Sequence, residues 1–323
     1  MNKIKESPLV KKVGINRIVL VIVLILMYLF FVIVTKGKFK GISRIVNAMN
    51  YAYFLGFLSL GVTFVIATGG IDFSIGPVMF CCALISGYCL NSYGVPMWLC
   101  LIISILVGTL FGIFNGWLVS YLSVAPFIVS MASMNIAKGL ASVFTKSTSV
   151  SWPQLADGGW YRNLVKIGTV PTGLFILLFF ALICGIIMGK TKIGRYILCL
   201  GSNMEAARLS GINVKKYCML AYVICGTLVG IGAIMFVGAY TTVQPGYGDQ
   251  YNNEAIAGAV MGGTSMVGGI ASIAGTVLGV FVISLLQEGI LAMGFTKDYQ
   301  LILTGIIVIV AVYIDIAARR RKN

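Results

Sequence analysis

The chain contains no histidine, and only nine of its 323 residues are Asp or Glu. The lack of histidine removes the usual base of a nucleophilic triad and the commonest metal ligand. No two cysteines form a Cys-x-x-Cys pair, and no two acidic residues lie close enough in sequence to suggest a catalytic dyad. We therefore expect no enzyme active site, within the membrane or outside it, no metal site and no cofactor.

Charged residues are also rare, at 10% of the chain, against 59% hydrophobic residues and a mean hydropathy of +0.98. Soluble domains are about a quarter charged, so this composition argues against a water-soluble fold. The charges are confined to a few short stretches. Between them lie apolar runs of about 18 residues or more, the length that a helix needs to cross a bilayer. The sequence predicts an all-α, polytopic membrane protein.

Ten apolar runs predict about ten membrane-spanning helices. They lie near residues 18–35, 51–68, 75–90, 97–121, 126–144, 172–189, 217–240, 252–263, 270–290 and 299–316. The first run lacks a small-residue cleavage site, so we interpret it as a retained helix and not as a signal peptide. The eighth is short and interrupted by glycines. We expect a cytoplasmic tail over 1–17, a transmembrane domain over 18–316 with a cytoplasmic loop over 190–216, and a basic cytoplasmic tail over 317–323.

The net charge of +15 is unevenly distributed. Lys and Arg gather at both termini and in the 190–216 loop. This pattern holds segments on the cytoplasmic side of a membrane, and it argues against nucleic-acid binding. Residues 145–171 and 241–251 then lie outside. One loop disagrees, because Lys36, Lys38, Lys40 and Arg44 would also lie outside; a missed or re-entrant segment there would change the helix count.

Glycines recur every four residues within several apolar runs. The examples are Gly108, Gly112 and Gly116, then Gly226 and Gly230, then Gly275 and Gly279. On one face of a helix such residues let a neighbouring backbone approach closely, which is how helices pack in lipid. We predict that these glycines serve packing alone.

Glycine and polar residues together interrupt two apolar runs, at residues 68–77 and 262–269. Glycine-broken helices in corresponding halves of a chain indicate a transport pathway, and a duplication that relates segments two to four to segments eight to ten would explain the pair. The pathway candidates are Gly69, Gly70, Asp72 and Ser74 in the first interruption, Gly262, Gly263, Thr264 and Ser265 in the second, and Glu254 ahead of it.

Two interpretations stay open for the acidic candidates. Asp72 is the only acidic residue between Glu6 and Asp157. A carboxylate within a membrane is costly unless it meets water or a partner. Asp72 and Ser74 therefore line or brace the pathway, or Asp72 caps the helix that follows, and these roles are not exclusive. The polar stretch 244–254 either pairs with a hydroxyl-rich solute or forms an ordinary solvated loop.

The cytoplasmic loop contains a short predicted helix over residues 204–209. Asn203 suits its N-cap, and Gly211 can end it in the left-handed conformation. The result is an amphipathic helix lying across the membrane face, with Ala206 and Ala207 small enough for close contact. It is either a lever that a partner grips or a plain connector.

Several motifs together resemble the ABC-type sugar permease family that handles ribose, xylose, arabinose and galactose. The resemblance extends from about Asn47 to Asp315. Its motifs are Gly69-Gly70-Ile71-Asp72-Phe73-Ser74-Ile75-Gly76, Pro126-Phe127-Ile128, Ala206-Ala207-Arg208-Leu209-Ser210-Gly211-Ile212, Glu254-Ala255-Ile256-Ala257-Gly258-Ala259-Val260-Met261-Gly262-Gly263-Thr264-Ser265 and Gly268-Gly269.

The resemblance implies the permease subunit of a monosaccharide importer in a bacterial plasma membrane. It implies three partners besides lipid: a cytoplasmic ABC ATPase, an extracytoplasmic sugar-binding protein and a second permease subunit. The chain has no G-x-x-x-x-G-K-[ST] motif, which agrees with an ATPase on another chain. The residues implied to couple to that ATPase are Asn203, Glu205, Ala206, Ala207, Arg208, Leu209, Ser210 and Gly211.

The alternative is an ion-driven secondary carrier of a small polar solute. Such carriers also contain broken helices, but they usually need buried acidic residues for ion coupling. Here the apolar runs contain few, chiefly Asp72, Glu254 and Glu288.

Overall fold

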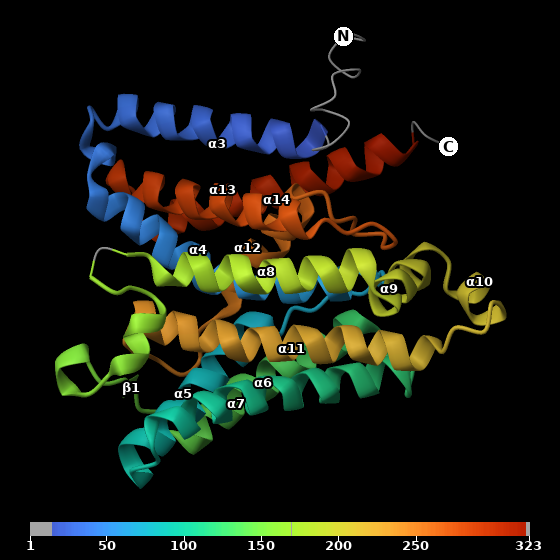
Figure 1. Cartoon of the computed structure of the whole chain (residues 1–323), viewed down its shortest axis with the longest axis horizontal. Coiled ribbons are helices and arrows are strands. Elements are labelled where there is room, and N and C mark those ends of the chain that lie inside the picture. Colours follow the sequence, from blue (N-terminus) through green and yellow to red (C-terminus); the bar gives the residue numbers. More distant parts are fainter. Residues whose placement is uncertain (1–14, 169, 321–323) are drawn as a thin grey trace.

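The computed structural model describes residues 15–168 and 170–320, so most of the predicted N-terminal tail and the last three residues lie outside the described part. Long helices run side by side along the longest axis of the molecule (Figure 1). They are α3 (Ile15–Val34), α4 (Ile42–Ala67), α5 (Ile75–Tyr93), α6 (Met97–Ser120), α7 (Pro126–Phe144), α8 (Thr172–Lys190), α11 (Val214–Ala239), α13 (Ile273–Ala292) and α14 (Lys297–Arg320). The predicted all-α membrane fold is confirmed.

The shorter elements lie at the two ends of this bundle or between its long helices. They are η1 (Lys38–Lys40), β1 (Val150–Ser151), η2 (Leu155–Asp157), η3 (Trp160–Leu164), α9 (Lys192–Ser202), α10 (Met204–Leu209), β2 (Thr242–Val243) and α12 (Asp249–Met261). The strands form one antiparallel pair, in which Val150 faces Val243. This pairing places the loops 145–171 and 241–251 at the same end, as the charge pattern predicts.

Each of the ten apolar runs falls on a helix. Within the described residues, eight helices are long and apolar enough to cross a membrane: α3, α4, α5, α6, α7, α8, α11 and α13. The other two runs fall on α12 and α14. Because α12 has only 13 residues, it is about 20 Å long and covers part of a bilayer.

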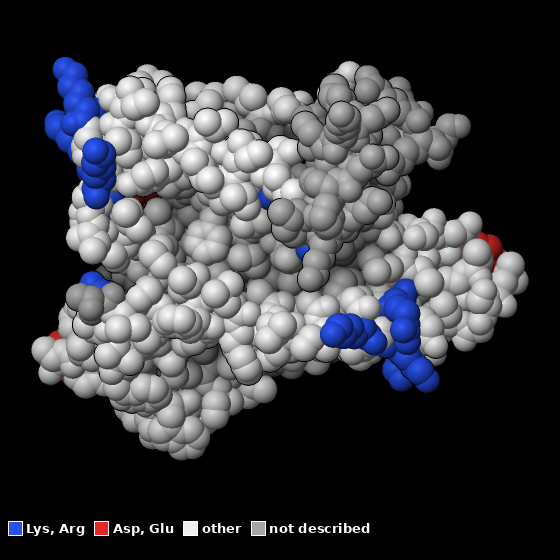
Figure 2. Space-filling model, turned by 45° about the horizontal axis from the view of Figure 1, so that its top comes forward, with Lys and Arg blue, Asp and Glu red and all other residues white. Residues whose placement is uncertain are grey.

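The link between α3 and α4 contains no further membrane segment. The short helix η1 follows α3 directly, and its Phe39 is fully buried against Tyr28 and Phe31. Lys36, Lys38 and Lys40 therefore sit on an anchored turn at the end of the bundle that carries β1 (Figure 1). In Figure 2 the larger groups of Lys and Arg side chains lie toward the two ends of the molecule, and only small blue areas show between them.

Burial explains why the apolar runs differ in composition. Helix α4 lies at the centre, with 89% of its spanning window buried, whereas only 11% of the α3 window is buried. The peripheral α3 turns its apolar side chains to lipid and is the most hydrophobic of these spans, whereas the central α4 contacts protein on nearly every side and accommodates buried polar residues such as Ser59 and Thr63. The most extensive helix pair, α6 with α11, approaches through Gly108 and Gly226, so the packing interpretation of these glycines is confirmed.

Candidate functional site

The first glycine interruption separates α4 from α5. The main chain leaves the helix after Ala67, and Gly69 takes the left-handed conformation at φ 84°. The Asp72 carboxylate oxygen Oδ1 accepts the backbone N–H of Ser74 at 2.8 Å and its hydroxyl at 2.6 Å. The N-cap position of α5 is held by Ser74. Asp72, two residues before the N-cap, therefore stabilises the turn that leads into α5.

This turn is tied to two further helices by a buried chain of hydrogen bonds. The Asn115 amide on α6 donates to the Ser74 hydroxyl at 3.0 Å, and the Ser133 hydroxyl on α7 donates to the Asn115 carbonyl. Asp72, Ser74, Asn115 and Ser133 are each at most 4% exposed. In this arrangement Asp72 braces the interruption, since its hydrogen bonds run to neighbouring buried protein groups.

Two substitutions show whether Asp72 stabilises the turn through its hydrogen bonds or through its negative charge. Asp72→Ala removes the acceptor of the Ser74 N–H and should lower the free energy of unfolding by about 1–3 kcal/mol. Asp72→Asn keeps an Oδ1 acceptor, so we expect a clearly smaller loss. Thermal melting of both proteins in detergent measures the difference. Equal losses in the two variants would show that the charge itself stabilises the turn.

The second interruption separates α12 from α13 and folds back on itself. The Thr264 hydroxyl accepts the Ser272 N–H at 3.3 Å, and the Ser265 N–H donates to the Ile270 carbonyl at 3.0 Å. Thr264 and Ser265 are each 1% exposed. Gly262 lies against α13, where a Cβ atom would be 2.3 Å from the Thr276 nitrogen. Gly262, Thr264 and Ser265 are thus packed in the protein interior, and Gly263 is half-buried.

The two interruptions meet each other and the helix α9. The Gly269 N–H donates to the Ala67 carbonyl at 3.1 Å. A Cβ atom on Gly268 would lie 2.8 Å from the Gly69 nitrogen and 2.9 Å from the Gly201 Cα. We call the backbone of Ala67, Gly69, Gly201, Gly268 and Gly269 the glycine junction. It joins α4, α9 and the second interruption at the end of the bundle opposite β1 (Figure 1).

The short helix predicted over residues 204–209 is confirmed as α10, which follows α9 after Asn203. The Asn203 side chain accepts the Ala206 N–H at 2.9 Å, and Gly211 is left-handed at φ 79°. Ala207 is the one residue of α10 that is buried against the bundle, whereas Leu209 is 79% exposed. The opposite face of α10 is thus uncovered in this chain.

Two charged side chains stand on the exposed face of α10. Arg208 and Glu205 form an ion pair at 2.6 Å. The hydrogen bond and the charge of Arg208 lower the pKa of Glu205, and the same contact raises the pKa of Arg208. Both groups therefore stay ionised at neutral pH. One turn away along α9, Cys199 is exposed.

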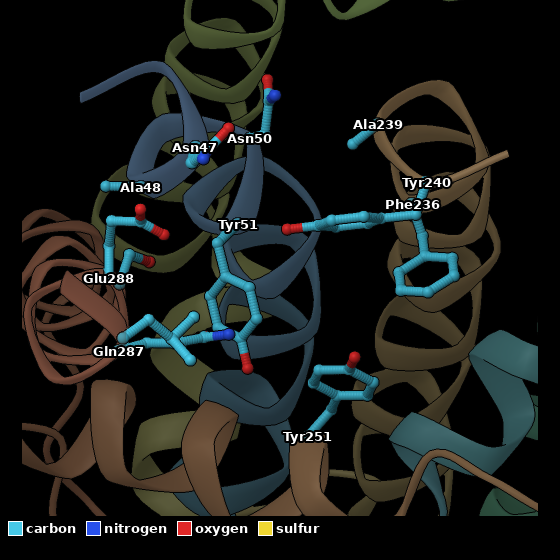
Figure 3. Close-up of a pocket in the computed structure, with 12 residues that line it drawn as sticks. Asn47, Ala48, Asn50, Tyr51, Phe236, Ala239, Tyr240, Tyr251, Gln287 and Glu288 are labelled. Atoms are coloured by element: carbon cyan, nitrogen blue, oxygen red, sulfur yellow. The ribbon is translucent and has the colours of Figure 1, made fainter. Parts of the chain in front are cut away.

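A pocket of about 400 Å³ opens between α4, α11, α12 and α13, at the end of the bundle that carries β1. We call it the outer pocket. In Figure 3, Gln287 and Glu288 stand on one side, Phe236 and Tyr240 stand on the other, and Tyr51 lies between them. Asn47, Asn50, Ala48, Ala239, Tyr251, Ser284 and Leu291 complete the lining. Its size and its mixture of aromatic and polar groups suit a small ligand.

The wall of this pocket is held by the buried carboxylate of Glu254. The Tyr51 hydroxyl donates to Glu254 Oε2, and Gln300 Nε2 donates to Oε1 at 2.8 Å. Glu254 is 1% exposed and stands behind Tyr51. It is the one predicted pathway residue near the outer pocket. The other eight lie in the two interruptions, between the pocket and the 190–216 loop.

Sequence reasoning did not select the residues that line the outer pocket. Asn47, Asn50 and Tyr51 lie in the first turns of α4, and Gln287 and Glu288 lie late in α13. The sequence does contain a signal for these residues, namely that they are polar residues inside apolar runs. Such residues are costly in a membrane and often mark functional sites. From the sequence, Glu288 stands out only as an acidic residue in an apolar run, and its neighbour Gln287 does not stand out.

Comparison with known proteins gives one family. Residues 44–312 match the family model described as branched-chain amino acid transport system / permease component. This range includes all the long helices except α3 and the end of α14.

Several curated proteins are similar along most of their length. The xylose transport system permease protein XylH of Escherichia coli (strain K12) is 29% identical in an alignment that covers 97% of this chain and 94% of that protein. The ribose import permease protein RbsC of the same strain is 31% identical, covering 86% and 87%. RbsC of Bacillus subtilis (strain 168) is 32% identical, covering 84% of each chain. No solved structure matches.

Proposed function

Because the chain belongs to the permease family described as branched-chain amino acid transport system / permease component, we propose that it is the membrane-spanning subunit of an ATP-driven monosaccharide importer. The choice of a sugar follows the names of the relatives, which are xylose and ribose permeases. As a permease subunit the chain carries no catalytic site, and the ATPase is a separate protein.

One observation carries the proposal: α10 is linked through α9 to the glycine junction, and rigid helices run from this junction to the outer pocket. Helix α4 extends from Tyr51 in the pocket wall to Ala67 in the junction. Helix α13 returns from the second interruption to Gln287 and Glu288. A displacement of α9 therefore acts on helices that bound the pocket, which is how rigid-body motion couples distant sites.

The mechanism follows from this geometry. Cytoplasmic ATPases grip the exposed face of α10, where Asn203, Glu205, Ala206, Arg208, Leu209, Ser210 and Gly211 are accessible and Ala207 anchors the helix to the bundle. ATP-driven closure of the ATPases pushes α9 against the glycine junction. The bundle then shifts between a state open to the outer pocket and a state open to the cytoplasm.

The remaining partners follow from the two ends of the molecule. An extracytoplasmic binding protein delivers sugar at the end that carries β1, over the outer pocket. A second permease subunit, of the same or a related sequence, completes the transport unit in a bacterial plasma membrane. The basic tail over 317–323 and the 190–216 loop then face the cytoplasm.

Exchange of the two charges on α10 tests the coupling role. In the double variant Glu205→Arg with Arg208→Glu, the ion pair within the helix can still form, but each charge faces the partner with the wrong sign. Like charges opposed at an interface cost several kcal/mol, so sugar uptake should fall by at least about tenfold. Membrane insertion should be unchanged. Uptake of radiolabelled sugar by cells that express the whole importer is the measurement.

The matched control is Lys192→Glu, which reverses an exposed charge in the same loop outside α10. It should leave uptake close to that of the unchanged protein. Full uptake in the double variant would refute the coupling role of α10. If the protein were an ion-driven carrier instead, an uncoupler would abolish sugar uptake and ATP depletion would leave it unchanged.

A further inference from the structure

The outer pocket contains a buried polar atom with no partner. The Gln287 side chain is 8% exposed, and its carbonyl oxygen Oε1 accepts no hydrogen bond from the described part of the chain. A buried amide oxygen loses its bonds to water and is destabilising unless another donor replaces them. Gln287 lines the pocket, and rotation of its side-chain amide would turn the buried Oε1 toward a bound solute, whose hydroxyl group can supply that donor.

Next to Gln287, the negative charge of Glu288 is neutralised by Arg44 of α4. Arg44 Nη1 lies 2.8 Å from Glu288 Oε1, and the Glu288 side chain is 8% exposed. Among the described residues, the other oxygen, Oε2, receives no hydrogen bond. Glu288 can therefore accept a further hydroxyl group while the pair as a whole carries no net charge.

The opposite side of the outer pocket is a fixed aromatic surface. Phe236 and Tyr240 are 5.3 Å apart between ring centres, and Phe236 also contacts Tyr251. Tyr51 is held in place because its hydroxyl donates to Glu254. Figure 3 shows the Tyr240 hydroxyl pointing across the pocket toward α4. Rigid rings of this kind offer an apolar face and a polar rim at little cost in side-chain entropy.

These groups distinguish solutes by charge. A monosaccharide presents hydroxyl groups at its edge and C–H groups on its faces, and it has no net or separated charge. A zwitterionic amino acid brings an ammonium and a carboxylate group, each of which needs an unpaired opposite charge. Arg44 and Glu288 are already paired with each other, so admitting a zwitterion would require breaking a partly buried ion pair.

We propose that the outer pocket is a carbohydrate-binding site of the permease itself, in which Gln287 and Glu288 receive sugar hydroxyls and the Arg44–Glu288 pair excludes amino acids. The choice of sugar as solute rests on the proposed function. The permease then contributes its own selectivity after the binding protein has released its cargo. The site is separate from the two glycine interruptions and from α10.

Direct binding tests the site without the partners. The full-length permease is placed in lipid nanodiscs with neither ATPase nor binding protein, and D-ribose and D-xylose are titrated by saturation-transfer NMR. We expect saturable binding of at least one of these sugars and no competition by L-leucine. Absence of saturable binding of either sugar, or equal binding of L-leucine, overturns the proposal.

Two variants test whether Gln287 and Glu288 bind the sugar, and a third serves as the control. Gln287→Leu removes the unpartnered oxygen, so it should weaken sugar binding at least tenfold while the melting temperature stays equal or rises. Glu288→Gln should also weaken binding at least tenfold. The control Asp249→Asn breaks the Lys138–Asp249 ion pair, which is outside the pocket lining, and should bind as the unchanged protein does.

The outcomes separate this site from the proposed function. If the whole importer takes up ribose or xylose but Gln287→Leu and Glu288→Gln bind and transport like the unchanged protein, the site assignment is wrong and the importer function stands. If the permease binds sugar but ATP-driven uptake is absent when all partners are present, the importer function is wrong and the binding site stands.

Discussion

Replacing Gly201 by alanine is expected to lower sugar uptake by about a hundredfold in a protein that still inserts into the membrane. A Cβ atom at this position would lie 2.0 Å from the Ala67 carbonyl oxygen and 2.4 Å from the Gly269 nitrogen. Both neighbours are backbone atoms that cannot rotate away. Helix α9 must therefore move off the glycine junction, and the push from α10 no longer reaches α4 and the second interruption.

The measurement is uptake per ATP hydrolysed by the reconstituted importer, since a broken mechanical link leaves hydrolysis running while transport stops. The control is Gly189→Ala near the end of α8, where a new Cβ atom would meet nothing within 4 Å. If Gly201→Ala transports as well as this control, the glycine junction is not the route by which α10 acts.

Replacing Gly226 by valine should abolish accumulation of the folded protein. A Cβ atom on Gly226 would lie 2.2 Å from the Gly108 carbonyl oxygen, and one on Gly108 would lie 2.4 Å from the Gly226 carbonyl oxygen. The backbones of α6 and α11 thus touch along a face where no side chain fits. Forcing them apart should cost about 3 kcal/mol or more, a large fraction of the stability of most proteins.

Yield of monodisperse protein after detergent extraction measures this effect. Gly139→Val in α7 makes the same substitution where nothing lies within 4 Å of the new Cβ atom, so it should leave the yield unchanged. Normal yield of Gly226→Val would mean that α6 and α11 can separate without loss of the fold.

The features that the sequence predicts well depend on local rules. Each apolar run became a helix because length and composition alone determine whether a segment can satisfy its backbone in lipid. The helix α10 was predicted together with its ends, since Asn203 and Gly211 act on atoms only a few residues away. The packing role of Gly108 and Gly226 follows from their four-residue spacing to other glycines.

The features that escaped prediction depend on contacts between distant segments. The outer pocket combines the start of α4, the end of α11 and the end of α13, which no periodicity brings together. Glu254 lies in a polar stretch that reads equally well as a solvated loop, yet it is 1% exposed because Tyr51 and Gln300 reach it from other helices.

The relation between the two interruptions is also a long-range property. Their similar composition suggested an internal duplication, which stays a prediction. The sequence pattern does not show that the two segments are in contact, which they are through the hydrogen bond from the Gly269 N–H to the Ala67 carbonyl. Nor does it show that Gly201, from a third segment, packs against both of these residues.

The exposed thiol on α9 gives this molecule a native attachment point for a reporter. Of the eight cysteines, six are buried and Cys89 is half-buried, which leaves Cys199 as the exposed one, two residues from Gly201. A maleimide fluorophore or spin label would therefore attach there selectively in the unaltered sequence. Its signal during nucleotide turnover would follow the motion of α9 in real time, with no need to engineer a cysteine-free background.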